Sequence, residues 1–401
     1  MKTIQTIRFI ILVSVSLTMN LYGSESQTKV SEPKAPKIAS GREIEIIVPA
    51  RPDSSSFQWK ICSPSEQGLD SDKLAELVDL IREGKRYPRI QSLLIVRHGC
   101  LVVEEYFNNW KAERLHILQS VTKSFTSALI GMAIARGEIQ GVDEKILDFF
   151  PDMEAIAHMD ERKASIRLKD LLTMRSGVDY HEQGPDSPHF RLNRTPTGWD
   201  KFYLDRPMAG DPGKNFNYDS GGVILLSAIL KNRTGKHADV YAEQSLFKSL
   251  GIKEKFWVKN QDGHPHTGGG LALKTRNMAR FGLLYLNKGK WEGEQVVPEE
   301  WIRESFKMHV DFGNPDQDVV GYGYLWWIQR PDPQGKGEQY IYAARGAKGQ
   351  YIFIVPEHDI VVAINADTQS GTQQRSIVEF LYGYILPAAH NHVATSIDTS
   401  F

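Results

Sequence analysis

One apolar segment limits how this chain can fold more than any other. Between Phe125 and Ala135 almost every residue is apolar or small, and Gly137 follows. A helix that is apolar all round has to be buried, and a glycine just beyond its last turn is a common stop. We therefore predict a buried helix here. Ser120 and Lys123 lie at its start and share one face, because residues three apart on a helix are neighbours.

A lysine in this position needs a chemical reason. A charged ammonium group is costly in a dry interior unless it is paired or loses its proton. A desolvated lysine has a lowered pKa and can remove the proton of a neighbouring serine, which turns that hydroxyl into a nucleophile. The N–H groups at the start of the helix would then stabilise negative charge on a reacting carbonyl. The alternative interpretation is a capping serine followed by a lysine whose charged end reaches solvent.

The Ser-x-x-Lys spacing does not decide between these interpretations. It occurs four times, at Ser26, Ser31, Ser120 and Ser245. The first two lie in a polar N-terminal segment, and Ser245 lies on a predicted amphipathic helix over 241–250. Ser120 differs from them because it opens the apolar helix.

The N-terminus has the pattern of a secretory signal. Lys2 and Arg8 precede the apolar run 9–19, and small residues follow at 23–24. We expect residues 1–23 to be a signal and the protein to be exported, to the periplasm or the extracellular space. The apolar run is short for a membrane span, so the only membrane contact we consider is through an uncleaved signal.

The overall charge bears on the kind of partner this protein binds. The formal net charge of −1 over 401 residues gives no bulk electrostatic case for a nucleic-acid partner.

The composition also changes along the chain. Residues 24–56 are rich in Ser, Pro, Lys and Glu and are interpreted as a loose arm, within which 46–48 could add one edge strand. A domain over 57–390 and a tail over 391–401 follow. After export, Cys62 and Cys100 could pair, and two buried free thiols are the alternative.

Periodicity places strands at both ends of the domain and helices between them. We predict a hairpin over 90–107 and antiparallel strands over 322–328, 339–344, 350–355 and 359–365. Helices are predicted over 69–84 (with Ser71 as a cap), 165–174, 222–235, 241–250, 275–286, 298–305 and 373–386. Residues 179–215 lack periodicity and are expected to wall a substrate cleft. The economical architecture is one antiparallel sheet made from both chain ends, with flanking helices and a mainly helical insertion over about 119–309.

Two further segments carry candidate site residues. Tyr218 precedes a second apolar helix, and its phenol could relay a proton if a nearby lysine lowers its pKa. A tyrosine that only packs its ring is the alternative. The turn around Gly346 has small residues, so a substrate could approach the backbone, and a free N–H there could join that of Ser120 in holding an oxyanion.

The same turn carries Arg345 and Lys348, which would offer cations to a substrate carboxylate; a plain hairpin with solvated charges is the alternative. His264 and His266 could be the start of a metal site, but no third ligand lies at a helpful spacing. We expect no metal and no cofactor.

At this point the sequence resembles the serine β-lactamase-related hydrolases. These include class C β-lactamases, DD-peptidases, family VIII esterases and aminohexanoate-dimer (nylon-oligomer) hydrolases. The resemblance covers about residues 65–388 and rests on three ordered motifs: Ser120-x-x-Lys123, Tyr218-x-Ser220 and the glycine-rich strand at Gly346. The flanking sequences 170–177, 269–273 and 349–357 agree with this resemblance. The resemblance implies the α+β, β-lactamase/transpeptidase-like fold.

The resemblance also implies roles. Ser120 is the acylated nucleophile, Lys123 its base, and Tyr218 the group that passes a proton to the leaving group. The N–H groups of Ser120 and Ala347 form the oxyanion hole. Ser220 stands where many relatives have asparagine or serine, and belongs with the substrate-binding residues.

One departure bears on the substrate. Lactamases and DD-peptidases carry Lys-Thr-Gly or Lys-Ser-Gly in the third motif, where this chain has Ala344-Arg345-Gly346. The pattern is nearer to the esterases and aminohexanoate-dimer hydrolases. We therefore expect a serine hydrolase that acts through an acyl-enzyme on a small-molecule ester or amide. The alternatives are a β-lactamase or DD-peptidase acting on cell-wall peptides, and a penicillin-binding-type sensor without turnover.

Overall fold

The computed structural model describes residues 6–9, 44–47, 57–87, 89–153, 155–313, 318–330 and 339–390. The chain divides into two compact units, 1–54 and 55–401. In the first unit, β1 (Thr6–Phe9) pairs antiparallel with β2 (Ile44–Ile47) in a sheet of two strands. The strand expected near 46–48 therefore has its partner in 6–9. The rest of the predicted signal (1–23) and arm (24–56), and the tail over 391–401, lie outside the described residues.

A nine-stranded sheet runs through the second unit, in the order β11-β12-β13-β14-β15-β16-β4-β5-β3. Neighbouring strands are antiparallel, except that β3 and β5 are parallel. The strands are β3 (Lys60–Ile61), β4 (Ile90–Arg97), β5 (Cys100–Tyr106), β11 (Val310–Asp311), β12 (Val319–Tyr322), β13 (Trp327–Gln329), β14 (Ile341–Gly346), β15 (Gln350–Val355) and β16 (Ile360–Ala366). The two chain ends meet where β16 pairs with β4, with Val362 opposite Ile95. This confirms the predicted sheet built from both ends of the domain.

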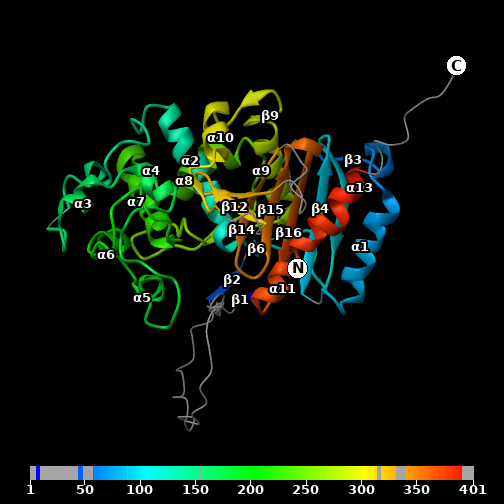
Figure 1. Cartoon of the computed structure of the whole chain (residues 1–401), viewed down its shortest axis with the longest axis horizontal. Coiled ribbons are helices and arrows are strands. Elements are labelled where there is room, and N and C mark those ends of the chain that lie inside the picture. The colour runs from blue at the N-terminus through cyan, green and yellow to red at the C-terminus, as the bar shows by residue number, and fades with distance from the viewer. Residues whose placement is uncertain are drawn as a thin grey trace, which may run out of the picture. The chain divides into compact units, whose positions relative to one another are not determined.

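Both faces of the sheet are covered, which is why its central strands are nearly continuous apolar runs. Along β4, Leu94 and Val96 belong to the core that contains α2 and α9, whereas Leu93 and Ile95 belong to the core on the opposite face. That second core contains α1 and the C-terminal helices (Figure 1). The domain is therefore three layers, with the sheet in the middle.

The helices of the second face are α1 (Ser71–Glu83), α11 (Gly371–Ser376), α12 (Val378–Phe380), the turn η6 (Leu381–Ile385) and α13 (Leu386–His390). The insertion between the two halves of the sheet holds η2 (Gln119–Val121), α2 (Thr122–Ala135), η3 (Ile146–Phe149), α3 (Glu161–Ser165), α4 (Leu168–Leu172), α5 (Pro188–Arg194), α6 (Trp199–Leu204), α7 (Ser220–Thr234), α8 (Ala238–Ala242), η4 (Glu243–Phe247), α9 (Thr275–Leu286) and α10 (Glu299–Phe306). Short turns η1 (Ser65–Gln67) and η5 (Pro356–His358) complete the set. The mainly helical insertion is confirmed.

Several element boundaries differ from the sequence-based expectations. The helix predicted over 165–174 is two short helices, α3 and α4, and the one over 373–386 is divided among α11, α12, η6 and α13. Residues 179–215 contain α5 and α6. The cap of α1 is Asp70 rather than Ser71, because the Asp70 carboxylate accepts the N–H groups of Asp72 and Lys73, each at 3.0 Å.

The strand predicted over 322–328 is two strands, β12 and β13, joined by a turn. Leu325 has a φ of 61°, and its N–H donates to the carbonyl of Leu172 at 3.0 Å. A Cβ at Gly323 would lie 2.0 Å from the carbonyl oxygen of Ser305. The chain therefore has to turn where it packs against the ends of α4 and α10, and contacts so distant in sequence leave no local pattern.

A small three-stranded sheet was not predicted from the sequence. β6 (His116–Ile117) pairs with β8 (Leu271–Leu273), which pairs with β7 (Phe256–Trp257). Each strand is only two or three residues long, too short for a periodic signal. A hairpin of β9 (Lys290–Trp291) and β10 (Glu294–Gln295) was missed for the same reason. The small sheet brings the glycine run 268–270 beside the start of α2.

Cys62 and Cys100, whose pairing the sequence left open, form a disulfide with their Cα atoms 5.8 Å apart. It joins the residue after β3 to the first residue of β5, on the edge of the large sheet. Among the described residues, no helix combines the length and apolar character needed to cross a bilayer.

Gly131 in α2 generates a stability prediction. A Cβ there would lie 2.2 Å from the Trp301 ring of α10, whereas a Cβ at Gly383 in η6 would meet nothing within 4 Å. Gly131→Ala should lower the free energy of unfolding by about 1–3 kcal/mol through overpacking. The matched change Gly383→Ala should instead raise it by up to about 1 kcal/mol, since alanine is the better helix former. Urea denaturation of both variants measures the difference, and equal effects would contradict the close packing of α2 on α10.

Candidate active site

The structure brings Ser120 and Lys123 together. The Nζ of Lys123 lies 2.9 Å from the Oγ of Ser120 and donates to the carbonyl of Gly268 at 2.6 Å. The Lys123 side chain is only 1% exposed. Burial lowers the pKa of Lys123 to about 8, although nearby Glu182 and Asp219 act in the opposite direction. Roughly one tenth of this lysine is therefore unprotonated at pH 7, far more than in an exposed lysine.

The local chain path explains why the serine is reachable and the lysine is not. Ser120 sits in the short turn η2, just before α2, and is half-buried. Gln119, immediately before it, has a φ of 51°, a left-handed conformation that costs free energy in a non-glycine residue. Lys123 lies inside α2, whose first turns are enclosed on all sides. The η2 turn thus leaves the Ser120 side chain accessible, whereas Lys123, one turn later on the same face, is buried.

The carbonyl that receives the lysine is held between helices. Thr267 accepts from the Thr126 hydroxyl of α2 at 3.0 Å and donates to the Val223 carbonyl of α7 at 2.7 Å. The N–H of Leu271 donates to the Thr122 hydroxyl at 3.2 Å. The segment that contains Gly268 is therefore fixed before any ligand binds, and Lys123 keeps one acceptor in either protonation state.

Tyr218 lies against the same pair. Its ring is 4.9 Å from the Nζ of Lys123 and is stacked on Trp327, with the ring centroids 5.5 Å apart. Burial raises the pKa of Tyr218, and a hydrogen bond with Ser120 lowers it by less. A proton relay through Tyr218 was predicted on the condition that a nearby lysine lowers this pKa, and in the structure burial dominates and raises it. Tyr218 is a neutral phenol and Lys123 is the group poised to accept a proton.

The turn before α7 holds Tyr218 in place. Asp219 caps α7 by accepting the N–H of Gly222 at 2.9 Å, and it also accepts the hydroxyl groups of Tyr203 and Ser176. Burial raises the pKa of Asp219 to about 6. Ser220, the first residue of α7, is buried, and its N–H donates to the Glu182 carboxylate at 2.8 Å.

The end of β14 lies alongside Ser120. A Cβ on Gly346 would be 2.4 Å from the carbonyl oxygen of Leu118, so a side chain there would push β14 away from η2. Ala347 follows at the turn and is exposed. In the described part of the chain, no group accepts its N–H, whereas its carbonyl accepts from Gln350 at 3.3 Å. An N–H that is free and exposed beside the Ser120 turn suits an oxyanion donor.

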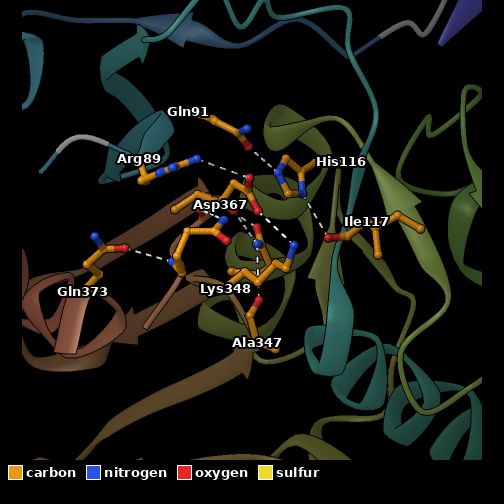
Figure 2. A network of polar contacts seen from close by, with 11 residues as sticks. Arg89, Gln91, His116, Ile117, Ala347, Lys348, Asp367 and Gln373 are labelled. Carbon is orange, nitrogen blue, oxygen red and sulfur yellow. Dashed lines mark hydrogen bonds and ion pairs between the residues drawn. The ribbon is translucent and has the colours of Figure 1, made fainter. Parts of the chain in front are cut away.

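The two cations of this turn have partners of their own. Lys348 pairs with Asp367, its Nζ 3.0 Å from the carboxylate, within the polar network drawn in Figure 2. The backbone carbonyl of Lys348 accepts from Thr368 at 3.0 Å. Arg345 is opposite Tyr351 in the β14–β15 pair, and its guanidinium lies 5.6 Å from the centroid of the Trp327 ring on which Tyr218 stacks. The Arg345 charge lowers the pKa of Tyr218, by less than burial raises it.

The two histidines of the His-Pro-His segment have separate partners. His266 hydrogen-bonds to Asn193 at 2.8 Å, while the ring of His264 lies 4.9 Å from that of His237. Across the described ranges, no group of three or more His, Cys, Asp or Glu side chains is arranged to hold a metal ion.

Two site residues escaped the sequence reasoning. Gly268 was not singled out from the sequence, because its carbonyl role depends on the unpredicted strand β8. Glu182 lies in the 179–215 segment expected to wall the cleft, and its charge raises the pKa of both Lys123 and Tyr218. One acidic residue among several in that segment carried no distinguishing signal.

Glu182 provides a direct test of this electrostatic arrangement. Glu182→Gln removes a negative charge that favours protonated Lys123, so the pKa of Lys123 should fall below its value of about 8. Carbon-13 NMR of labelled lysine Cε atoms measures that pKa by titration. The remote, exposed Glu292→Gln is the control and should leave it unchanged. An unchanged or higher Lys123 pKa in Glu182→Gln would show that the carboxylate does not face the lysine.

The chain was compared with known proteins. The sequence profile of the Beta-lactamase family matches residues 79–381. The 6-aminohexanoate-dimer hydrolase of Paenarthrobacter ureafaciens is 21% identical over 318 residues, covering 75% of this chain and 78% of that protein. Among solved structures, EstCE1, a hydrolase with promiscuous acyltransferase activity, superposes with a TM-score of 0.65 at 16% identity, covering 79% of this chain and 100% of the other.

The octameric penicillin-binding protein homologue of Pyrococcus abyssi superposes with a TM-score of 0.59 at 20% identity, covering 77% of this chain and 76% of the other. At such identities the two structures show the fold, and it is the β-lactamase/transpeptidase-like fold expected above. The family match spans most of the domain, from within α1 to the C-terminal helices. The chain belongs to the beta-lactamase family of hydrolases.

Proposed function

We propose that this protein is an exported serine hydrolase that forms an acyl-enzyme on Ser120 and acts on a small-molecule ester or unstrained amide. The observation that carries the proposal is the buried Lys123, whose Nζ lies 2.9 Å from the Ser120 hydroxyl and whose pKa is lowered to about 8. A lysine held only for structure would gain from a carboxylate partner. This one has a hydroxyl and a carbonyl instead.

The first half of the reaction follows from these contacts. Neutral Lys123 donates to the Gly268 carbonyl, which leaves its lone pair to receive the proton of Ser120. The freed Ser120 oxygen attacks the substrate carbonyl and forms a tetrahedral intermediate. Its oxyanion is held by the N–H groups of Ser120 and Ala347. The left-handed Gln119 and the close approach of Gly346 to Leu118 support this role, because both fix the backbone on either side of the two donors.

The second half needs a proton donor at the leaving group. Tyr218 is protonated because burial raises its pKa, and it contacts both Ser120 and Lys123. It passes its proton to the leaving oxygen or nitrogen, and the ammonium of Lys123 restores it. Water then attacks the acyl-enzyme while the same groups act in reverse, which releases the carboxylic acid and returns the Ser120 proton.

The charges around the cluster favour a substrate without a carboxylate at the position that β-lactams require. Lys348 is engaged by Asp367, and the Arg345 guanidinium packs on the Trp327 ring. Among the charges that act on Tyr218, the effect of Glu182 is larger than the opposing effect of Arg345. Glu182 would repel a carboxylate placed beside Tyr218. The similarity to an aminohexanoate-dimer hydrolase and to EstCE1 also supports an ester or amide as the substrate.

The acyl-enzyme is tested by intact-protein mass spectrometry with a p-nitrophenyl short-chain ester, with nitrophenol release followed in parallel. We expect a transient acyl mass and steady release in the parent, and neither in Ser120→Ala. Ser245→Ala is the control, because Ser245 has the same spacing to Lys248 on another helix and should retain both signals.

Full turnover by Ser120→Ala would refute the proposed nucleophile. A long-lived penicilloyl adduct with little ester turnover, in a parallel sample with a penicillin, would point instead to a cell-wall peptidase or a penicillin sensor. Absence of any adduct or turnover with both probes would direct the assay to aminohexanoate-type amides.

The pH dependence of the reaction should follow the titration of Lys123, the proposed base. Because Lys123 must be unprotonated to accept the serine proton, kcat/KM should rise with pH and level off above about 8, the pKa of Lys123. In Glu182→Gln the rise should move to lower pH. Stopped-flow acylation across pH measures both profiles. A rate that falls as pH increases through this range would contradict a lysine base.

The Lys348–Asp367 ion pair should affect the reaction rate, because it holds the adjacent Ala347 N–H in position. Lys348→Met and Asp367→Asn should each lower kcat by about tenfold with little change in KM, less than the 100- to 1000-fold expected for complete loss of an oxyanion donor. The double variant should be no worse than either single one. Lys288→Met, which breaks the exposed Lys288–Glu299 pair, is the control. Losses that appear only in KM would instead assign Lys348 to substrate binding.

A further inference from the structure

A cavity lies in the helical insertion, and none of Ser120, Lys123 or Tyr218 lines it. Its volume is about 480 Å³, within the range typical of small-molecule sites. The side chains that line it include five cations and one carboxylate: Lys145, Arg167, Lys169, Arg175, Lys214 and Asp170. The formal net charge of the whole chain is −1, so this concentration of positive charge does not reflect bulk composition.

Part of the positive charge is neutralised and part is not. Asp143, outside the cavity, pairs with Arg167 at 2.9 Å and with Lys169 at 2.6 Å. The buried Asp170 accepts the N–H of Arg167 at 2.8 Å, and its charge also interacts with those of Lys169, Arg175 and Arg167.

Lys145, Arg175 and Lys214 form no ion pair with any carboxylate in the described ranges, and Arg175 donates only through Nε, to the Thr173 hydroxyl at 3.2 Å. Three cations that share a cavity repel one another unless an anion lies between them. The free terminal nitrogens of Arg175 are available for such an anion.

The walls of the cavity are rigid without a ligand. Backbone hydrogen bonds join 144–146 to 166–168, from Ile146 to Ile166 and from Leu168 to Glu144, both at 2.9 Å. The N–H of Arg175 donates to Asp170, and the N–H of Gly213 donates to Arg175, both at 2.7 Å. Three segments distant in sequence are thus fixed side by side, and each brings at least one cation. Lys145 and Lys214 are themselves exposed, so the preorganisation lies in the backbone of these segments and in the half-buried Arg175.

We infer that this cavity binds a small polyanion with at least two anionic groups, phosphate or carboxylate. The guanidinium of Arg175 presents paired N–H donors that match the oxygens of either group. Lys145 and Lys214 supply point charges from the 144–146 and 212–214 segments, so a ligand with separated charges reaches all three cations. The site is distinct from the proposed hydrolase centre and does not depend on that proposal.

The experiment is isothermal titration calorimetry of the full chain with pyrophosphate in one arm and citrate in the other, at about physiological ionic strength. We expect saturable binding to one site in at least one arm. A stronger response to pyrophosphate assigns a phosphate ligand, and a stronger response to citrate assigns a carboxylate ligand. The variant Lys145→Gln/Lys214→Gln should weaken binding by at least about tenfold, because two charge-assisted contacts are lost.

The matched control is Lys248→Gln/Lys290→Gln, which removes the same two charges at exposed positions outside the cavity and should bind like the parent. Thermal unfolding of both double variants verifies that each is folded, and Arg175→Gln provides an independent loss of affinity. Equal weakening in the control would show that net charge alone is responsible and would overturn the inference. So would the absence of saturable binding in both arms at ligand concentrations up to about 10 mM.

Discussion

The burial of one lysine is the constraint on which the rest of the site depends. Lys123 is 1% exposed, and an ammonium so enclosed would be strongly destabilising without acceptors. The protein supplies two, the Ser120 hydroxyl and the Gly268 carbonyl, and neither is charged. Desolvation is therefore only partly compensated, which leaves the pKa of Lys123 near 8. A carboxylate in place of the Gly268 carbonyl would raise the pKa of Lys123 and disfavour the neutral amine.

This balance explains why the surroundings of Lys123 are so heavily cross-linked. The glycine segment has to present its carbonyl at 2.6 Å, and the Thr126–Thr267–Val223 hydrogen bonds hold it there. The close approach of Gly346 to Leu118 sets the other wall. Lys348 does not contact Ser120 or Lys123. It pairs with Asp367 and stabilises the turn between β14 and β15.

The sequence predicted the features that depend on local chemistry or on strong periodicity. The buried helix, the sheet from both chain ends and strands such as 350–355 follow from apolar runs that few other structures could accommodate. The juxtaposition of Ser120, Lys123 and Tyr218 was expected from ordered motifs and is present in the structure. What could not be predicted depends on contacts between distant segments. The short strand β8, the turn at Leu325 and the direction of the Tyr218 pKa shift all come from tertiary packing. The position of Glu182 and the side of β14 on which Arg345 lies could not be predicted either. The first depends on the path of a loop and the second on strand register.

The pairing of β4 with β16 has a consequence for biosynthesis. A nascent chain that has been translated as far as residue 340 already contains Ser120, Lys123 and Tyr218, yet it lacks the three strands β14, β15 and β16. Until they emerge, the buried edge of β4 has no partner and α9 has only part of the sheet to pack against. Contacts of such long sequence separation form slowly, since the closure of a long loop precedes any gain from packing. The Ser120–Lys123–Tyr218 group therefore lacks the wall formed by Gly346 of β14 until the last strands of the sheet have been synthesised.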